Sequence, residues 1–318
     1  MIRFGILGCG TIARRFAAAL NKSDRAELAA CAARQTDRAE AFAAQFGGRA
    51  YGSYEALLAD PEIQAVYIAT VHTAHAELAK KAILTGKAVL SEKPFFVNSR
   101  EAEDVVQLAR EKNILIMEGF WTRTQPAYQQ AMQWIKEGRI GKLRLIKAAF
   151  CFSMPYREEL KGHRLWNPET AGGAFWDAGI YPYEFATGIM GKPPVEVQTM
   201  VAKAPTGVDM TVSMNLRFEG DVIADLLTSI GGTTDGTGTI TGSEGYITLD
   251  YFVGSRHAEL HQGRETVEVF DDPEEEGFVH EIAHFVSLLE EGRNESDINP
   301  LALTLDLTQR GEGILNSR

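Results

Sequence analysis

A glycine-rich turn follows directly on a short apolar strand at the start of the chain. Residues 2–7 are β-prone, and the sequence GCGTIA occupies 8–13 without a gap. The spacing G-x-G-x-x-A, followed by an amphipathic stretch, predicts a strand, a tight turn and a helix. Gly8 permits the tight turn, Gly10 permits close approach of the backbone to a ligand, and Ala13 permits the helix to pack on the strand.

Backbone N–H groups at the start of that helix, near Thr11 and Ile12, are expected to bind the pyrophosphate of a dinucleotide. The position of the motif, straight after a strand, is the context in which such a turn binds a nucleotide. The alternative is a glycine turn of an α/β protein that binds no ligand.

Strand and helix patterns then alternate five or six times, which predicts a doubly wound parallel sheet of the α/β class. Beyond about residue 126 the pattern changes to consecutive β-prone runs separated by turn signals, which predicts an open, mainly antiparallel sheet. We therefore predict a dinucleotide-binding Rossmann domain over 1–123 and an α+β substrate domain over 124–318. The closing helix near 300–314 is free to pack back on the first domain.

The second predicted strand, 28–33, ends in Arg34, and Arg38 follows four residues later. An NAD-binding protein is expected to place Asp or Glu at this strand end, where the carboxylate binds the adenosine ribose hydroxyls. Two guanidinium groups suit a 2′-phosphate instead. The sequence therefore predicts NADP as the cofactor, with NAD as the alternative. Asp37 is a competing ribose ligand, although it also suits a helix start.

Thr70, His72 and His75 follow the buried strand 65–70, at the edge of the sheet where open α/β sheets bind ligands. We predict that they contact the cofactor, through hydrogen bonds to nicotinamide, ribose or substrate. Two histidines three residues apart also suit a metal ion, but the sequence offers no third ligand, so we predict no metal. Capping or packing is the alternative for His75.

A lysine ends the next predicted strand, in the sequence Glu92-Lys93-Pro94. Proline disfavours helical backbone at the residue before it, so Lys93 is held at a fixed strand end. Glu92 and Lys93 are therefore predicted to lie at the cofactor. The alternative is a surface ion pair before a turn.

In the second half, the stretch 172–182 (GGAFWDAGIYP) carries the most reactive side chains. Asp177 and Tyr181 are four apart, which places them on one face of a helix. Pro182 is tolerated only in a first turn, so this helix is expected to begin close to Asp177. Tyrosine near a helix start is commonly a core or interface residue, and acid–base chemistry is the alternative.

Composition excludes several classes of protein. The formal net charge of −11 argues against a basic face for nucleic acid or an anionic membrane. Three scattered cysteines match no zinc or iron–sulfur spacing and are expected to be buried hydrophobes in a reducing compartment. The start of the chain leaves no room for a signal peptide, and no apolar run approaches the about 20 residues of a membrane span. We expect a cytoplasmic protein.

These motifs together resemble the glucose-fructose oxidoreductase / inositol dehydrogenase family (Gfo/Idh/MocA). The resemblance rests on the glycine turn at 8–10, on Glu92-Lys93-Pro94, and on the 172–181 stretch, and it spans essentially the whole chain. Within the family the chain is most similar to the dimeric dihydrodiol dehydrogenase and NADP-dependent D-xylose 1-dehydrogenase branch. Members similar to inositol dehydrogenase carry histidine where Tyr181 stands here, which argues against inositol as the substrate.

The resemblance implies a dehydrogenase that transfers hydride between NADP and a secondary alcohol of a sugar, an anhydrosugar or a trans-dihydrodiol. It implies catalytic roles for Lys93, Asp177 and Tyr181, with Tyr181 as the proton-transfer residue, and a homodimer through the C-terminal sheet. Free tyrosine titrates at about 10, and a neighbouring ammonium such as that of Lys93 favours the phenolate. Asp177 would orient the lysine or the substrate.

Two rival functions remain: a redox-neutral glycosidase that uses retained NAD, and a non-catalytic sensor that binds NADP. The substrate is left open, because the pocket depends on side chains that the sequence does not place. Trp121 and Arg123, which follow the last strand of the parallel series, are predicted to contact the cofactor or line the pocket. Further pocket candidates are Phe152, Tyr156, Arg164 and Trp166.

Overall fold

The computed structural model describes residues 1–316, which divide into two compact units. The first unit comprises 1–120 and 276–308, and the second comprises 121–275 and the chain from residue 309 onward. The first boundary lies close to the predicted one. The return of the chain to the first unit at Glu276 differs from the prediction of one continuous second domain.

The first unit contains a six-stranded sheet in which every pair of neighbours is parallel. Its strands are β1 (Ile2–Leu7), β2 (Ala26–Ala32), β3 (Arg49–Tyr51), β4 (Ala65–Ile68), β5 (Ala88–Glu92) and β6 (Ile116–Gly119). The order β3-β2-β1-β4-β5-β6 confirms the predicted doubly wound sheet. The order reverses between β1 and β4, and such sheets bind ligands outside the carboxyl ends of the strands at this point.

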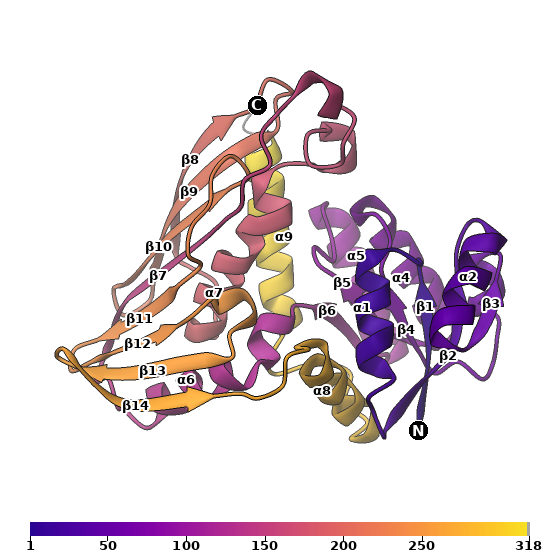
Figure 1. The fold of residues 1–318 in the computed structure, drawn as a ribbon, viewed down its shortest axis with the longest axis horizontal. Helices are drawn as coiled ribbons and strands as arrows, with labels where there is room; N and C mark the ends of the chain where they lie inside the picture. Colours follow the sequence, from indigo (N-terminus) through magenta and orange to yellow (C-terminus); the bar gives the residue numbers. More distant parts are fainter. Residues whose placement is uncertain (317–318) are drawn as a thin grey trace. The chain divides into compact units, whose positions relative to one another are not determined.

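Helices cover both faces of the parallel sheet (Figure 1). They are α1 (Thr11–Leu20), α2 (Thr36–Phe46), α3 (Tyr54–Leu58), α4 (His75–Leu84), α5 (Ser99–Lys112) and α8 (Phe278–Glu290). One apolar core joins the sheet to α1, α2 and α8, and a second joins it to α3, α4 and α5. The rings of Phe278 and Phe285 contact those of Phe16 and Phe4, so α8 is a helix of the first unit.

The second unit contains an eight-stranded sheet in the order β14-β13-β12-β11-β7-β10-β9-β8. Its strands are β7 (Leu143–Cys151), β8 (Glu196–Lys203), β9 (Asp209–Phe218), β10 (Val222–Ser229), β11 (Gly238–Gly242), β12 (Tyr246–Leu249), β13 (His257–Gln262) and β14 (Glu265–Asp271). Every pair is antiparallel except β7 with β10. This confirms the predicted open, mainly antiparallel sheet, although β13 was not predicted.

Within this unit, α6 (Pro126–Lys136) and α7 (Ile180–Met190) lie on one face of the sheet (Figure 1). On the opposite face, side chains alternate along the strands with exposed apolar groups among them. Met200 of β8 is 76% exposed, and Ile223, Leu227 and Val269 are also exposed. No described helix of the same unit covers them. The last helix, α9 (Leu301–Asn316), contributes its first turns to the first unit and the rest to the second.

Candidate functional site

The glycine turn joins β1 to α1 at the point where the strand order reverses. Gly8 has a φ of +103°, a conformation that favours glycine, and an added Cβ would collide with the carbonyl of Ala69. The Gly8 amide donates to the Ala32 carbonyl at 2.9 Å, and the Ala69 amide donates to the Leu7 carbonyl at 2.8 Å. The turn is therefore held by β2 on one side and by the end of β4 on the other.

The N-terminus of α1 fits the pyrophosphate of a dinucleotide. Gly10 is its N-cap, and no described side chain caps the helix there. A Cβ built on Gly10 meets no described atom within 4 Å, so the backbone faces open space at this point. The amides near Thr11 and Ile12 thus carry the partial positive charge of the helix end into a place where a ligand can approach.

Arg34 and Arg38 both lie exposed beyond the end of β2. Burial raises the pKa of Tyr54, and the positive charges of Arg34 and Arg38 oppose that rise. Asp37 accepts a hydrogen bond from the Arg38 amide at 2.9 Å in the first turn of α2. The structure therefore leaves both guanidinium groups exposed after β2 and gives Asp37 a local partner.

The predicted site residues after β4 differ in burial. Thr70 and His72 are half-buried, and His72 opens a short 3-10 helix (His72–Ala74). His75 is fully buried, with Nδ1 2.9 Å from the Pro94 carbonyl oxygen and Nε2 3.2 Å from that of Thr70. Burial lowers the pKa of His75. The predicted contact of His75 with a cofactor is therefore replaced by a link between two loops, which is the packing alternative.

Lys93 lies in the loop after β5 and is half-buried. Glu92 before it and Phe95 after it both make hydrogen bonds within the protein. Glu92 accepts a hydrogen bond from the Tyr67 hydroxyl, and burial raises the pKa of its carboxyl group. Two residues after Lys93, the Phe95 amide donates to Glu118 Oε1 at 3.0 Å. We leave Glu92 out of the cofactor site, because its side chain is turned to the protein interior.

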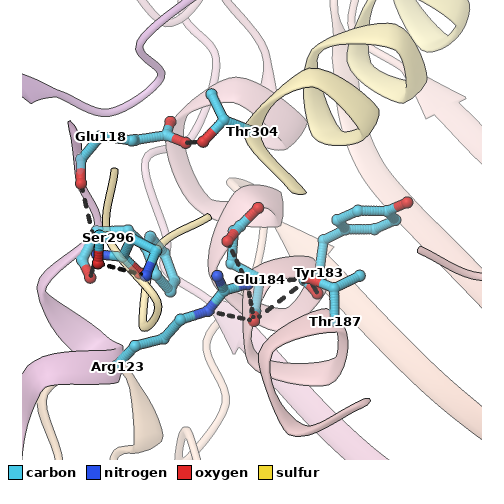
Figure 2. Close-up of polar contacts among 9 residues, drawn as sticks. Glu118, Arg123, Tyr183, Glu184, Thr187, Ser296 and Thr304 are labelled. Atoms are coloured by element: carbon cyan, nitrogen blue, oxygen red, sulfur yellow. Dashed lines mark hydrogen bonds and ion pairs between the residues drawn. The ribbon is translucent and has the colours of Figure 1, made fainter. Parts of the chain in front are cut away.

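Glu118 of β6 fixes this loop from the other side. Its second carboxyl oxygen accepts a hydrogen bond from the hydroxyl of Thr304 in α9 at 2.8 Å, as Figure 2 shows. Asn299 also contacts this region by donating to the Phe120 carbonyl at 3.2 Å. No sequence pattern predicts these contacts, because the residues lie far apart in the chain.

In the second unit, Tyr181 and Asp177 lie at the start of α7. The segment Phe175–Gly179 is a π-helical turn that runs into α7, so helical structure does begin close to Asp177 as predicted. A wider turn is the expected response to Pro182, because proline lacks an N–H and crowds the carbonyl four residues earlier. Asp177 pairs with Arg164 at 2.5 Å.

Phe150 links the Tyr181 ring to two further aromatic side chains. Phe150 of β7 meets it edge-on, with ring centroids 5.3 Å apart and an interplanar angle of 80°. Phe150 also contacts Phe152 and Tyr251 at centroid distances of 6.3 and 5.9 Å. Tyr181 itself is half-buried, and its ring contacts Phe150 of this cluster.

Arg123 lies in the core of the second unit, contrary to its predicted contact with the cofactor. Its guanidinium pairs with the Glu184 carboxylate and donates to the Glu184 carbonyl at 2.7 Å and to the Thr187 hydroxyl at 3.1 Å (Figure 2). The side chains of Arg123 and Glu184 are 1% and 2% exposed. We leave Arg123 out of the cofactor site, because these contacts bury its charge.

The remaining pocket candidates also divide by burial. Trp166 is fully buried and meets Tyr156 edge-on at 5.5 Å, so it belongs to a small core beneath the 152–166 loops. Trp121 is half-buried at the start of a short helix (Trp121–Thr124), and the next residue, Thr122, donates to the Val253 carbonyl at 2.6 Å. Phe152 is half-buried and Arg164 is exposed.

Within residues 1–316, no group of three or more His, Cys, Asp and Glu side chains is arranged to hold a metal ion. No helix within this range has the length and apolar character needed to cross a bilayer.

Comparison with protein families assigns the class of the chain. The sequence model of the oxidoreductase family with an NAD-binding Rossmann fold (Gfo/Idh/MocA) matches residues 2–120, and that of the GFO/IDH/MocA C-terminal domain matches residues 128–248. The chain therefore belongs to the Gfo/Idh/MocA oxidoreductases, and its first unit is an NAD(P)-binding domain.

Individual relatives are similar over most of the chain. Human trans-1,2-dihydrobenzene-1,2-diol dehydrogenase is 32% identical over 314 residues, which is 95% of this chain and 92% of the human protein. The mouse protein of the same name is 36% identical over 248 residues, which is 77% of this chain and 73% of the mouse protein.

Solved structures agree in fold. KijD10, a 3-ketoreductase from Actinomadura kijaniata in complex with NADP and TDP-benzene, superposes with a TM-score of 0.83 at 27% identity and covers 98% of this chain and 95% of its own. Aldose-aldose oxidoreductase from Caulobacter crescentus has a TM-score of 0.85 at 19% identity, with coverage of 99% and 97%, and supports the fold alone.

Proposed function

We propose that this protein is an NADP-dependent dehydrogenase that oxidises a secondary alcohol of a trans-dihydrodiol, a sugar or an anhydrosugar, or reduces the corresponding ketone. The observation that carries the proposal is the cofactor turn itself. Gly8 locks the turn between β2 and β4, and Gly10 leaves the N-terminus of α1 open to an anionic ligand.

NADP is favoured over NAD by the residues after β2. Arg34 and Arg38 are both exposed there, and guanidinium groups bind a phosphate with charge-assisted hydrogen bonds. The 3-ketoreductase with the same fold was crystallised with NADP. We expect Arg34→Ala to weaken NADP binding by about tenfold or more while leaving NAD binding nearly unchanged.

Bound NADP would supply the hydride acceptor, and this chain would supply proton transfer and orientation. We assign the proton transfer to Tyr181: its phenolate would accept the hydroxyl proton in oxidation, and its phenol would donate a proton to the carbonyl oxygen in reduction. Lys93 would hold the phenolate by its positive charge. Asp177, which pairs with the exposed Arg164, would orient the substrate together with that arginine.

Two observations support a cyclic diol among the substrates. The named relatives are dehydrogenases of trans-1,2-dihydrobenzene-1,2-diol. Phe150 contacts Tyr181 and is itself in contact with Phe152 and Tyr251, which together offer aromatic surface on which a flat cyclic diol can pack. A sugar ring can also pack on such a surface, so the substrate panel below includes both.

We also propose a homodimer formed through the helix-free face of the second sheet. Exposed apolar side chains on that face, including Met200, Ile223 and Leu227, are typical of a surface that a partner covers. Leu227→Asp is expected to shift sedimentation from a dimer to a monomer, whereas an unchanged sedimentation coefficient would contradict this interface.

The test of the activity is the change in nicotinamide absorbance with NADP and a panel of dihydrodiols, aldoses and anhydrosugars. Tyr181→Phe and Lys93→Met should each lose about 10²–10⁴-fold in turnover while they retain NADPH binding. Tyr128→Phe and Lys80→Met are matched controls, since Tyr128 lies in the core and Lys80 pairs with Asp104 on the surface. Both controls should turn over at the wild-type rate.

Contrary outcomes separate the rival functions. Glycoside hydrolysis without a net change in absorbance, with cofactor retained, would point to the redox-neutral glycosidase. Binding of NADPH without turnover of any substrate would point to the sensor. Wild-type turnover in Tyr181→Phe would remove that residue from the mechanism.

A further inference from the structure

The helical segment that runs into α7 takes its N-terminal cap from a strand of the second sheet. Ala174 is the N-cap of the Phe175–Gly179 turn, and its methyl group cannot accept a hydrogen bond from the first amides of the helix. Asp209, the first residue of β9, supplies an acceptor: the Phe175 amide donates to its Oδ2 at 2.6 Å. Asp209 lies 34 residues further along the chain and is 5% exposed. The cap is therefore a buried carboxylate from a distant part of the sequence.

Charge makes this cap a strong one. A carboxylate at a helix N-terminus meets the partial positive charge of the helix end. A hydrogen bond from an amide to a carboxylate is also shorter and stronger than one between neutral groups, as the 2.6 Å separation here illustrates. Asp209 lies opposite Lys203 in the β8–β9 ladder, so the sheet sets its position. The start of the helix is therefore tied directly to the sheet.

Two glycines let the chain approach close enough for this bond. Gly173 has a φ of +126°, and a Cβ built on it would lie 2.0 Å from Asp209 Oδ1. A Cβ on Gly172 would lie 2.4 Å from the Arg164 carbonyl oxygen, and the Gly172 amide donates to the Asn167 carbonyl at 3.1 Å. A side chain at either glycine would push the backbone away from these partners. Close contact with the carboxylate therefore requires glycine at both positions.

The far end of the Phe175–Gly179 turn is held against the sheet as well. A Cβ on Gly179 would lie 2.8 Å from Cγ2 of Thr228 in β10. The Thr228 hydroxyl donates to the carbonyl of Phe150, whose ring contacts that of Tyr181. The turn is thus fixed at its first residue by a carboxylate and at its last by β10. Asp177 lies between these two points, and Tyr181 follows two residues after the second.

We propose that Asp209 is a positioning residue of the reaction, which holds Asp177 and Tyr181 in place through the Phe175 amide. The inference rests on the proposed function, which assigns proton transfer to Tyr181. Because the carboxylate is buried against the turn, its effect on the substrate passes through the backbone. Removal of the carboxylate leaves the helix start without this acceptor, so the turn shifts. Misplacement of a reacting group by about 1 Å can lower a rate about a hundredfold.

The test compares Asp209→Ala with Asp209→Asn in the full-length protein. Asparagine keeps an oxygen that can accept the Phe175 amide, whereas alanine removes the acceptor. Asp272→Ala is the matched control, because Asp272 is also a buried aspartate of the second unit and accepts a backbone amide, that of Glu274, at 3.1 Å. If Asp209→Ala is not recovered folded, Asp209→Ser replaces it, with the same expected direction.

Three measurements are made on each variant. The first is the oxidation of trans-1,2-dihydrobenzene-1,2-diol with NADP, or of D-xylose where the diol does not react, which gives kcat, KM and a pH profile. The second is NADPH affinity by fluorescence titration, which reports whether the first unit is intact. The third is hydrogen exchange of the peptides that cover residues 172–182, followed by mass spectrometry. Hydrogen exchange needs no turnover, so it reads the turn independently of the reaction.

Asp209→Ala should lower kcat by about tenfold to a hundredfold, with a smaller change in KM and no loss of NADPH affinity. The pH of half-maximal oxidation should rise, because a displaced Tyr181 phenolate loses the stabilisation that Lys93 is proposed to give. Amides of 174–182 should exchange faster in this variant. Asp209→Asn should recover most of the rate and the protection, and Asp272→Ala should match the wild type.

Four outcomes count against the inference. Wild-type kcat in Asp209→Ala would overturn it, and so would an equal loss of rate in Asp272→Ala. An unchanged pH profile would reduce Asp209 to a structural role, and unchanged hydrogen exchange would show that it does not hold the turn. If wild-type protein oxidises neither alcohol, the proposed function fails, while hydrogen exchange still decides whether Asp209 fixes this segment.

Discussion

Replacement of Glu281 on α8 should stabilise the protein, and the gain should grow as the pH rises. This carboxyl group is fully buried, and neither of its oxygens has a hydrogen-bond partner among the described residues. Burial raises the pKa of Glu281 well above its ordinary value of 4.5, and the charges of Glu92 and Glu118 raise it further. The folded protein therefore favours the protonated form of this residue.

The direction of the pH effect follows from proton linkage. At a pH between the ordinary value of 4.5 and the raised pKa, the folded protein binds a proton at Glu281 that the unfolded chain has released. The free energy of unfolding therefore falls as the pH rises through this range, by about 1.4 kcal/mol for each unit of difference between the two pKa values. Above the folded pKa the loss is complete and constant. Below the ordinary value there is no loss.

Two substitutions separate charge from polarity at this position. Glu281→Gln removes the titration but keeps a buried polar group, so it should stabilise at pH 8 by about 1–3 kcal/mol and have little effect near pH 4.5. Glu281→Met also removes the unsatisfied polar atoms and should stabilise at both pH values. A gain of 1 kcal/mol corresponds to a rise in Tm of about 2–4 °C for chains of this class.

Thermal unfolding followed by circular dichroism at a series of pH values is the assay. Glu291→Gln is the matched control, because Glu291 is exposed at the C-terminal end of the same helix. A Glu281→Gln variant whose Tm falls with pH as steeply as that of the wild type would show that Glu281 does not titrate as argued. So would a control variant with the same gain.

Three further predictions test other parts of the fold. Gly10→Ala should weaken NADPH binding by about tenfold, which fluorescence titration measures. It should change the free energy of unfolding by at most about 1 kcal/mol in thermal unfolding, because the added Cβ meets no described atom within 4 Å. Tyr128→Phe should stabilise by about 1 kcal/mol in urea unfolding, because its buried hydroxyl has no hydrogen-bond partner among residues 1–316. Arg123→Met should lower the free energy of unfolding by about 3–5 kcal/mol, because it leaves Glu184 buried without its counter-charge. The double variant with Glu184→Gln should recover most of this loss. An equal loss in the single and double variants would contradict the ion pair.

Local pattern predicted most of the secondary structure, because the parallel strands are apolar runs between clear turn signals. Strand β1 was predicted with its observed bounds, Ile2–Leu7. Strand β13 was missed, because Ala258 and Leu260 are its only apolar residues facing the core, and its other positions are polar. The pattern of α8 showed an apolar face but not which sheet it covers. That depends on contacts with residues near the start of the chain, such as Phe4 and Phe16.

The candidate site could be predicted where backbone conformation decides the chemistry. A turn at Gly8 and an open helix end at Gly10 follow from residue type and spacing alone. The contacts of a long polar side chain do not follow from residue type and spacing, because they depend on which distant residue lies beside it in the fold. Arg123 finds Glu184, 61 residues away, and the sequence has no signal for that pairing.

Residues at the carboxyl ends of the parallel strands therefore differ in the contacts that their side chains make. Their position in the sequence had made all of them candidates for binding the cofactor. Glu92 binds Tyr67, and His75 binds the carbonyl of Pro94. These two contacts fix the backbone immediately before and after Lys93. The catalytic role proposed for Lys93 would need such support, because rigid placement of a reacting group supplies much of the rate. The two contacts therefore explain why the side chains of Glu92 and His75 are buried beside this loop.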